Sequence, residues 1–244
     1  MKRLRDILKP RHNPVVEPSA FKAPRPTTID GRPVEIGEPP TRIKEDTLYV
    51  FLDKWRPLQI FDKAFYKLVP GRPPGLVING FRMHVRGLSA YLREATARLA
   101  GLRVWDTCGG LGYSAKYLRG KFSEVIVSEK SRAVLELAAY NPFSHHLFGM
   151  QTYWANAWEM LGALDNLDAV FHDPPSFSQA PDLYSAEFLR ELAARLRPGG
   201  MLYHYTGAPG IRRGRRLYVR IAKQMREMGF AVKKLQYGLL GVKK

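Results

Sequence analysis

The chain has 244 residues, 45% hydrophobic and 25% charged, as is typical of a globular protein with one sizeable domain and a small appendage. No run of apolar residues approaches the roughly 18 that a membrane span needs, and the charged N-terminus lacks the apolar segment of a signal peptide. The single cysteine, Cys108, excludes an internal disulfide and a cysteine-rich zinc site, so we expect a cytoplasmic protein.

Net charge is the unusual bulk property. Lys and Arg number 39 against 22 Asp and Glu, which gives a net charge of +17 and a pI near 10.1. Such an excess favours a polyanionic partner such as RNA, because cationic side chains displace counterions from phosphates. A charge adapted to a hot or salty cytoplasm is the alternative, and the single cysteine and 18 prolines are compatible with it.

Residues 1–45 are basic and contain eight prolines, which would interrupt any helix, so we expect a mostly irregular arm. Its basic residues could contact a phosphate backbone or simply be solvated. Residues 46–86 are richer in strand formers, notably at 47–52, and Asn79-Gly80 is a pair that favours a tight hairpin turn. We expect a small β-rich pre-domain here, and the sequence does not indicate its role.

Helix and strand signals alternate over residues 87–244, which we expect to form the main domain. Expected strands cover residues 102–106, 124–129, a third segment directly before Trp154, 168–173 and 201–205, with two more between 230 and 244. Expected helices cover residues 89–100, 113–118, 185–196 and about 215–228, and another begins after Ser131 as N-cap. This alternation predicts a doubly wound α/β fold with a mainly parallel sheet covered on both faces.

A glycine-rich turn follows the first of these strands. Asp106 ends the strand, Gly110 and Gly112 follow it, and Glu129 ends the next strand, where a carboxylate can bind both ribose hydroxyls of a nucleotide. Dinucleotide-binding enzymes share this pattern, but Asp106 would then lie near an anionic pyrophosphate. Next to the sulfonium and amino groups of S-adenosyl-L-methionine (SAM) the same charge is favourable, so the electrostatics favour SAM.

A second polar cluster ends the expected fourth strand. Asp173 is followed by Pro174 and Pro175, and two prolines after an acid predict a rigid, extended turn. Asp173 could accept a hydrogen bond from a substrate nitrogen and orient its lone pair for attack on a methyl group. An ordinary strand-ending turn is the other interpretation, and the match at three strand ends speaks against it.

These motifs carry a resemblance. The segment at 104–112, Glu129, Asp173-Pro174-Pro175 and the segment at 196–202 resemble class I SAM-dependent methyltransferases over residues 102–206. More narrowly, the chain is similar to a family of predicted archaeal methyltransferases of unknown substrate. The segments that carry this similarity are Asp106-Thr107-Cys108, Asn141-Pro142-Phe143-Ser144, His172-Asp173-Pro174-Pro175, Leu183-Tyr184-Ser185 and His204-Tyr205-Thr206-Gly207.

The resemblance implies SAM as cofactor and a Rossmann-like sheet of seven strands whose last pair is antiparallel. By position, Asp106 and the glycines would surround the methionine part of SAM, Glu129 the ribose and Asn156 the adenine. On sequence alone, an ordinary loop role for Asn156 is equally compatible. The expected cofactor-binding residues are Asp106, Thr107, Cys108, Gly109, Gly110, Gly112, Glu129, Asn156 and Ala157, and the expected catalytic residues are Asp173, Pro174 and Pro175.

Two departures from the class bear on the chemistry. Cys108 occupies the usual place of the first glycine, and Ser176 separates Pro175 from the aromatic residue, Phe177, that could stack on a base. The pattern with Phe177 is similar to that of some ribosomal RNA base methyltransferases. The expected fourth and fifth strand ends hold no cysteine, so we exclude covalent methylation of pyrimidine carbon 5.

A run of arginines follows the expected fifth strand, and its composition suits phosphate contacts and base stacking, although a solvated helix start is the alternative. We therefore expect methylation of a nitrogen in a structured RNA. The expected substrate-binding residues are Ser176, Phe177, Tyr184, Arg212, Arg213, Arg215 and Arg216.

Three alternatives stay open: a methyltransferase acting on a small metabolite, one acting on a protein, and an RNA-binding module with a non-catalytic cofactor fold. His145 and His146 have no acid or cysteine at ligand spacing, so we expect no metal site. His172 and His204 could reach the pocket or be structural.

Overall fold

A computed structural model describes residues 1–84, 87–207 and 212–244, and in the helix that begins at Arg212 it describes side chains from Leu217 onward. In this part of the chain the main sheet has eight strands in the order β1-β11-β10-β9-β12-β13-β15-β14. Neighbouring strands within the group β9 to β13 are parallel to one another. At one edge of the sheet β1 pairs antiparallel with β11, and at the other edge β15 and β14 form antiparallel pairs. Its strands are β1 (Lys2–Arg3), β9 (Arg103–Asp106), β10 (Glu124–Glu129), β11 (Gln151–Trp154), β12 (Leu167–His172), β13 (Leu196–Tyr205), β14 (Phe230–Lys234) and β15 (Gly238–Lys243).

The count of seven strands is corrected by one. All seven expected strands are present, and the eighth, β1, comes from the N-terminal arm, where Lys2 pairs with Trp154 and Arg3 with Tyr153. A two-residue strand has no periodicity that a sequence pattern could reveal. A second correction concerns β13, which begins at Leu196 and includes the Arg197–Gly200 segment that we expected to form a turn before the strand.

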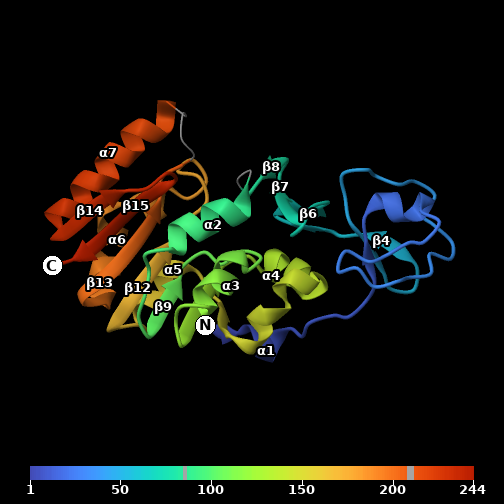
Figure 1. Cartoon of the computed structure of the whole chain (residues 1–244), viewed down its shortest axis with the longest axis horizontal. Helices are drawn as coiled ribbons and strands as arrows, with labels where there is room; N and C mark the ends of the chain where they lie inside the picture. Colours follow the sequence, from blue (N-terminus) through green and yellow to red (C-terminus); the bar gives the residue numbers. More distant parts are fainter. Residues whose placement is uncertain (85–86, 208–211) are drawn as a thin grey trace.

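Helices cover both faces of the sheet (Figure 1). Residues of α2, α3 and α4 share one core cluster with Val104 of β9, while α5, α6 and α7 share another with its neighbour Trp105. Successive strand residues thus point to opposite helical layers, as a doubly wound sheet requires. The helices are α1 (Leu4–Ile7), α2 (Leu88–Thr96), α3 (Tyr113–Arg119), α4 (Arg132–Tyr140), α5 (Ala157–Leu161), α6 (Ala186–Arg195) and α7 (Arg212–Glu227).

The helix starts follow local chemistry. The hydroxyls of Ser131 and Ser185 accept hydrogen bonds from Val134 N and Phe188 N, so Ser131 is the N-cap that we expected, and Ser185, expected as the first helical residue, is an N-cap too. The start predicted at Ser89 is wrong: α2 begins at Leu88, with Gly87 as N-cap in the left-handed region at φ +71°. The described residues also form three 3₁₀ segments: η1 (Pro18–Lys22), η2 (Pro142–Gly149) and η3 (Pro181–Tyr184).

Two small antiparallel sheets precede the main domain. The first contains β2 (Val15–Val16), β3 (Tyr49–Phe51) and β4 (Trp55–Pro57), and the second contains β5 (Gln59–Asp62), β6 (Ala64–Val69), β7 (Gly75–Ile78) and β8 (Phe81–Arg82). Figure 1 shows β6, β7 and β8 between the main sheet and the lobe that contains β4. The expected Asn79-Gly80 hairpin is present, with both residues at positive φ. The division into three domains stays a prediction.

The second small sheet packs directly on the main domain. Ile60, Tyr66 and Ile78 contact the core cluster that contains α2, α3 and α4. The Tyr113 hydroxyl, at the start of α3, donates a hydrogen bond to the carbonyl oxygen of Pro74 at 2.7 Å. The pre-domain is therefore anchored beside the loop that precedes α3. Within the described residues, no helix is long and apolar enough to cross a membrane.

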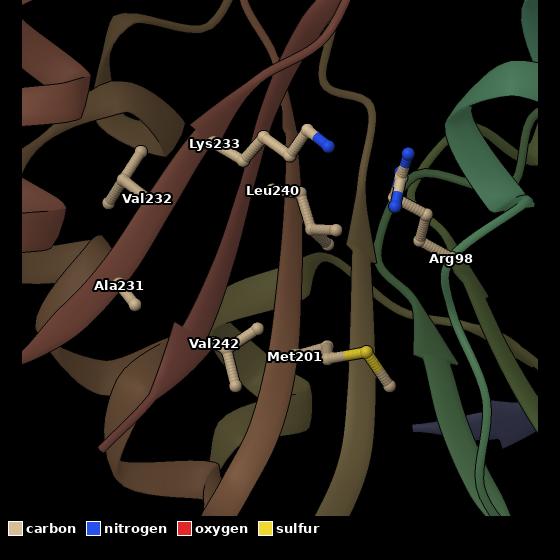
Figure 2. Close-up of a pocket in the computed structure, with 7 residues that line it drawn as sticks. All are labelled: Arg98, Met201, Ala231, Val232, Lys233, Leu240 and Val242. Atoms are coloured by element: carbon tan, nitrogen blue, oxygen red, sulfur yellow. The ribbon is translucent and has the colours of Figure 1, made fainter.

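A shallow surface groove of about 420 Å³ lies on the open face of β13, β15 and β14. Figure 2 shows Leu240 and Met201 on neighbouring strands, with the charged ends of Lys233 and Arg98 beside them. None of the expected site residues lines this groove.

Candidate active site

Three carboxylates lie at the carboxyl edge of the main sheet. Asp106 ends β9, Glu129 ends β10, and Asp173 directly follows β12. Asp106 pairs with Val127 on one side and Phe171 on the other, so the three acids belong to adjacent strands. Ligands of open α/β sheets bind at this edge, beside the point where strand order reverses, and here the order reverses between β9 and β12.

The turn after β9 needs its glycines for different reasons. Gly112 lies at φ +80°, and a Cβ there would meet the Leu147 side chain at 2.5 Å. A Cβ at Gly109 would lie 2.2 Å from Val127, whereas one at Gly110, at φ +53°, would have nothing within 4 Å. Gly109 and Gly112 therefore allow close packing of the loop, and Gly110 leaves open space in front of it.

Glu129 is held by backbone amides. Its Oε2 accepts a hydrogen bond from Gly110 N at 3.0 Å, and its Oε1 accepts one from Ser131 N at 2.7 Å. Burial raises the pKa of this carboxyl, while the two amide hydrogen bonds lower it in part. The glycine loop and the acid are thus joined into one structure, with the carboxylate beside the open space at Gly110.

Among the three carboxylates, Asp106 is the one whose charged form is least favourable. It is fully buried, and burial together with the charges of Asp173 and Glu129 raises its pKa to about 7, against a lowering hydrogen bond from Ser114. The Ser114 hydroxyl donates to Oδ2 at 2.5 Å. Oδ1 is buried without a hydrogen-bond partner in the described residues, although the Cys108 amide lies near enough to lower the pKa slightly. An unpaired carboxylate oxygen here suits a cationic ligand.

Asp173 lies in an aromatic environment. The buried Tyr91 hydroxyl donates a hydrogen bond to Asp173 Oδ2 at 2.8 Å. Burial raises the pKa of Asp173 to about 6, and the hydrogen bond from Tyr91 lowers it in part. The Tyr91 ring contacts three further tyrosine rings, Tyr203, Tyr205 and Tyr237, at centroid distances of 6.4, 5.7 and 5.1 Å. An acid bonded to one member of such a tyrosine cluster can hold an amine.

The Pro174-Pro175 turn is braced by Tyr184, whose hydroxyl donates to the carbonyl oxygen of Pro175 at 2.8 Å. Beyond the turn, Phe177 packs edge-on against Tyr184 at 5.7 Å and is 42% exposed. The guanidinium of Arg220 lies 4.9 Å from the centre of the Phe177 ring. An exposed ring with a cation beside it thus follows the acid-bearing turn.

The buried histidines differ in their bonding. Nε2 of His172 lies 2.9 Å from the Leu183 carbonyl oxygen, so it carries the proton, and Nδ1 accepts from the Thr107 hydroxyl at 2.7 Å. Burial lowers the pKa of His172 well below its usual range, so the ring is neutral and joins β9 to the η3 segment. His204 Nε2 is buried without a partner in the described residues, and burial lowers its pKa to about 4.

Asn156 and Ser176 both form local hydrogen bonds. Asn156 caps α5: its Oδ1 accepts from Glu159 N at 2.9 Å, and its Nδ2 donates to Glu159 Oε1 at 2.7 Å. Ala157 is the buried first residue of that helix. Ser176 is exposed and its hydroxyl donates to Gln179 at 3.0 Å. The contacts that we expected from Asn156 and Ser176 stay predictions.

Three expected features need separate statements. Cys108 is half-buried, and burial raises the pKa of its thiol. The side chains of Arg212, Arg213, Arg215 and Arg216 lie outside the described residues. His145 and His146 bond to the carbonyl oxygens of Ala139 and Gly112, and in the described residues no group of three His, Cys, Asp or Glu could hold a metal ion.

Comparisons with known proteins agree with the site that this geometry indicates. A family profile described as S-adenosyl-L-methionine-dependent methyltransferase matches residues 144–235. An uncharacterized protein of Methanocaldococcus jannaschii is 42% identical over 196 residues, which cover 75% of this chain and 67% of that protein. The chain belongs to the SAM-dependent methyltransferase family, together with this archaeal relative.

Solved structures agree with the methyltransferase at the level of fold. A spermidine synthase in complex with the transition-state analogue AdoDATO superposes with a TM-score of 0.63 at 17% identity, over 76% of this chain and 73% of that one. A methyltransferase from Geobacter sulfurreducens gives a TM-score of 0.51 at 18% identity, over 66% and 80%. The expected α/β methyltransferase fold, the enzyme class and SAM as cofactor are thereby confirmed.

The candidate site includes Tyr91 and Ser114, which the sequence patterns missed, and Arg220, which belongs to the arginine run expected after the fifth strand. Tyr91 bonds to Asp173 from 82 positions away, and Ser114 bonds to Asp106 from within α3. Arg220 reaches Phe177 from α7. A serine two residues after Gly112 was a usable signal, because the first turn of that helix must face the end of β9. Nothing local marks Tyr91.

Proposed function

We propose that this methyltransferase transfers a methyl group from SAM to a nitrogen of an RNA base. The observation that carries the proposal is the half-buried Asp173 with its hydrogen bond from the buried Tyr91, at the sheet edge next to Asp106 and Glu129. A carboxylate in this position can accept a hydrogen bond from an acceptor nitrogen and direct its lone pair.

The cofactor fits the residues present. SAM supplies a methyl group bonded to a positively charged sulfur, which a neutral nitrogen can attack. Asp106, with its unpaired Oδ1, would hold the cationic part of the cofactor, and Glu129 would accept hydrogen bonds from the ribose hydroxyls. Gly110 would leave room for the ligand in front of the loop, and Asn156 would face the adenine from the end of β11.

Asp173 would hold the acceptor nitrogen by a hydrogen bond and accept the proton that the nitrogen loses on methylation. With a pKa of about 6, its carboxylate is largely ionised at neutral pH and can accept a hydrogen bond or a proton from the nitrogen. Tyr91 would keep the carboxylate oriented, and Pro174-Pro175, braced by Tyr184, would keep the backbone rigid. Phe177 would stack on the base, since its ring is partly exposed beyond the turn.

RNA is the substrate class that the charge supports. A net charge of +17 would make association with RNA favourable and steeply dependent on salt. Arg220 beside Phe177 places a cation next to the proposed base-stacking ring. The arm and the arginines from Arg212 to Arg216 are further proposed phosphate contacts.

A small amine metabolite is the second candidate acceptor, favoured by one specific observation. Asp173 is bonded to Tyr91, whose ring contacts three further tyrosine rings, and an acid beside aromatic rings can recognise an ammonium group without any need for RNA. This candidate makes the overall charge irrelevant to substrate binding.

Transfer of labelled methyl from SAM to separate RNA, protein and metabolite extracts tests the proposal. We expect label in RNA, lost after ribonuclease treatment and absent with Asp173→Ala. Label confined to the metabolite extract would replace the RNA proposal with the second candidate. Calorimetry with SAM on both proteins is the control for an intact cofactor site.

A further inference from the structure

We infer that the tips of two adjacent β-hairpins in the pre-domain form a second RNA-contacting surface, which binds a single-stranded part of the substrate by base stacking. This hairpin-tip surface consists of Phe61, Lys63, Phe81 and Arg82. The inference rests on the proposed RNA substrate and assigns a role to a segment that the active site does not use.

Topology brings the two tips together. The β5–β6 turn at Asp62-Lys63 and the β7–β8 turn at Asn79-Gly80 lie at the same end of the sheet, because strand direction alternates along β5-β6-β7-β8. Asn79 clamps them: its side-chain oxygen accepts from Phe65 N, and its own amide donates to the Phe65 carbonyl oxygen, both at 2.8 Å. The tips are thus one rigid structure.

The two phenylalanine rings are left to solvent. Phe61 is 79% exposed and Phe81 is 66% exposed, more than any other large aromatic side chain in the described residues. The sheet does not need them for packing, since Ile60, Tyr66 and Ile78 already contact the core. Phe61 pairs with Phe65 and Phe81 with Ile78, so the rings lie on opposite faces of the sheet and flank the tip, three strand spacings or about 14 Å apart.

Charge identifies the kind of partner. From Gln59 to Arg82 the sequence holds four basic residues and one acid. Lys63 and Arg82 are exposed, and neither forms an ion pair with a carboxylate of the described residues, although the Arg82 guanidinium extends from the tip along β7 towards Gly75. Exposed aromatic rings with unpaired cations are the combination that binds single-stranded nucleic acid. A second copy of a chain with charge +17 would instead bring like charges together.

The surface lies at a useful distance from the active site. The opposite end of the same hairpins is anchored to the start of α3, where Tyr113 bonds to Pro74, next to the glycine loop. The six residues of β6 span about 20 Å between the two ends. An RNA that fills the active site with one base would therefore reach the tips with a flanking segment, and the tips would select for RNA longer than a single nucleoside.

A binding measurement tests the inference. The probe is a fluorescein-labelled single-stranded oligouridylate, titrated against the wild type, Phe61→Ala/Phe81→Ala and the control Leu102→Ala. Leu102 is also exposed, at 67%, but it lies directly before β9, at the amino-terminal end of that strand and opposite the end that carries Asp106. We expect affinity to fall about tenfold or more in the double variant, from the lost stacking, and to stay unchanged in the control. Lys63→Gln and Arg82→Gln should each reduce the steepness of a plot of log affinity against log salt concentration by about 1.

Outcomes are separable from those of the proposed function. If the wild type binds and methylates RNA while the double variant binds equally well, the hairpin-tip inference is wrong and the proposed function stands. If the wild type neither binds nor methylates RNA, both are wrong. Sedimentation distinguishes the remaining case: a dimer that becomes monomeric in the double variant, with unchanged RNA affinity, would assign the tips to self-association and overturn the inference. Unchanged SAM binding by calorimetry shows that the variants are folded.

Discussion

Tyr91 on α2 donates a hydrogen bond to Oδ2 of Asp173, 2.8 Å away, and so links the helix that follows the pre-domain to the turn proposed to hold the acceptor nitrogen. Tyr91 is buried and Asp173 is half-buried, and in the proposed function Tyr91 is a positioning residue that acts through Asp173.

Tyr91→Phe should lower kcat/KM about tenfold or more, because a hydrogen bond to the half-buried carboxylate of Asp173 is lost while the ring packing is kept. The bond lowers the pKa of Asp173, which is about 6 with Tyr91 present. Activity should therefore fall as pH drops through about 6 in the wild type, and the fall should begin at higher pH in the variant. A pH–rate profile measures both, and Tyr117→Phe on α3 is the control. An unshifted acid limb would show that Tyr91 does not act through Asp173.

Asp106→Asn should weaken SAM binding but increase the stability of the protein in the absence of SAM. The pKa of Asp106 is about 7 in the folded protein against an ordinary value of 3.8, so the folded state binds more protons than the unfolded state between these values. Stability from this group is therefore lost as pH rises towards 7. Without SAM, the free energy of unfolding of the variant at pH 8 should exceed that of the wild type by an amount on the order of a few kcal/mol. This difference should become smaller near pH 5.

Urea unfolding at both pH values gives the comparison, and calorimetry should show SAM binding at least tenfold weaker in Asp106→Asn. An equal stability difference at pH 8 and pH 5 would mean that the ionisation of Asp106 is not the cause. Undiminished SAM affinity would remove Asp106 from the cofactor site.

The two positive-φ glycines of the loop should respond differently to alanine. Gly112→Ala places a Cβ 2.5 Å from the Leu147 side chain in addition to backbone strain, whereas Gly110→Ala meets no atom within 4 Å. We expect about 1 kcal/mol of destabilisation for Gly110→Ala and clearly more for Gly112→Ala. Denaturant unfolding of both variants without SAM measures this, and equal losses would contradict the packing argument.

Asn156→Ser tests the predicted adenine contact without loss of the helix cap, because serine is also a good N-cap. Stability should change by only a few tenths of a kcal/mol, while SAM affinity should fall severalfold if the amide contacts adenine. Asn156→Ala is the companion variant and should cost about 1 kcal/mol from the lost cap. Unchanged SAM affinity in both variants would leave Asn156 with a structural role alone.

Much of the main domain was predictable because its signals are local. Most strands of the doubly wound part contain a short apolar run, and Ser131 marks the start of its helix as an N-cap. The strand ends at Asp106, Glu129 and Asp173 come together because parallel strands bring their carboxyl ends to one edge. That topological rule made the acids of the site visible without any structure.

What the patterns missed depends on contacts between distant segments. The pairing of Lys2–Arg3 with β11, and the approach of Tyr91 to Asp173, leave no local periodicity. His172 could be read either way until its two ring nitrogens were seen to bond to Thr107 and Leu183. The exposure of Phe61 and Phe81 was equally hidden, since a phenylalanine in a strand is more often buried than exposed.

Nucleoside analysis of methylated RNA tests the central claim most directly. Total RNA is incubated with the enzyme and SAM carrying a deuterated methyl group, digested to nucleosides and examined by mass spectrometry. The account predicts a deuterated methyl group on a base nitrogen, absent with Asp173→Ala. A methyl group on a ribose oxygen or a base carbon, or none in RNA at all, would contradict it.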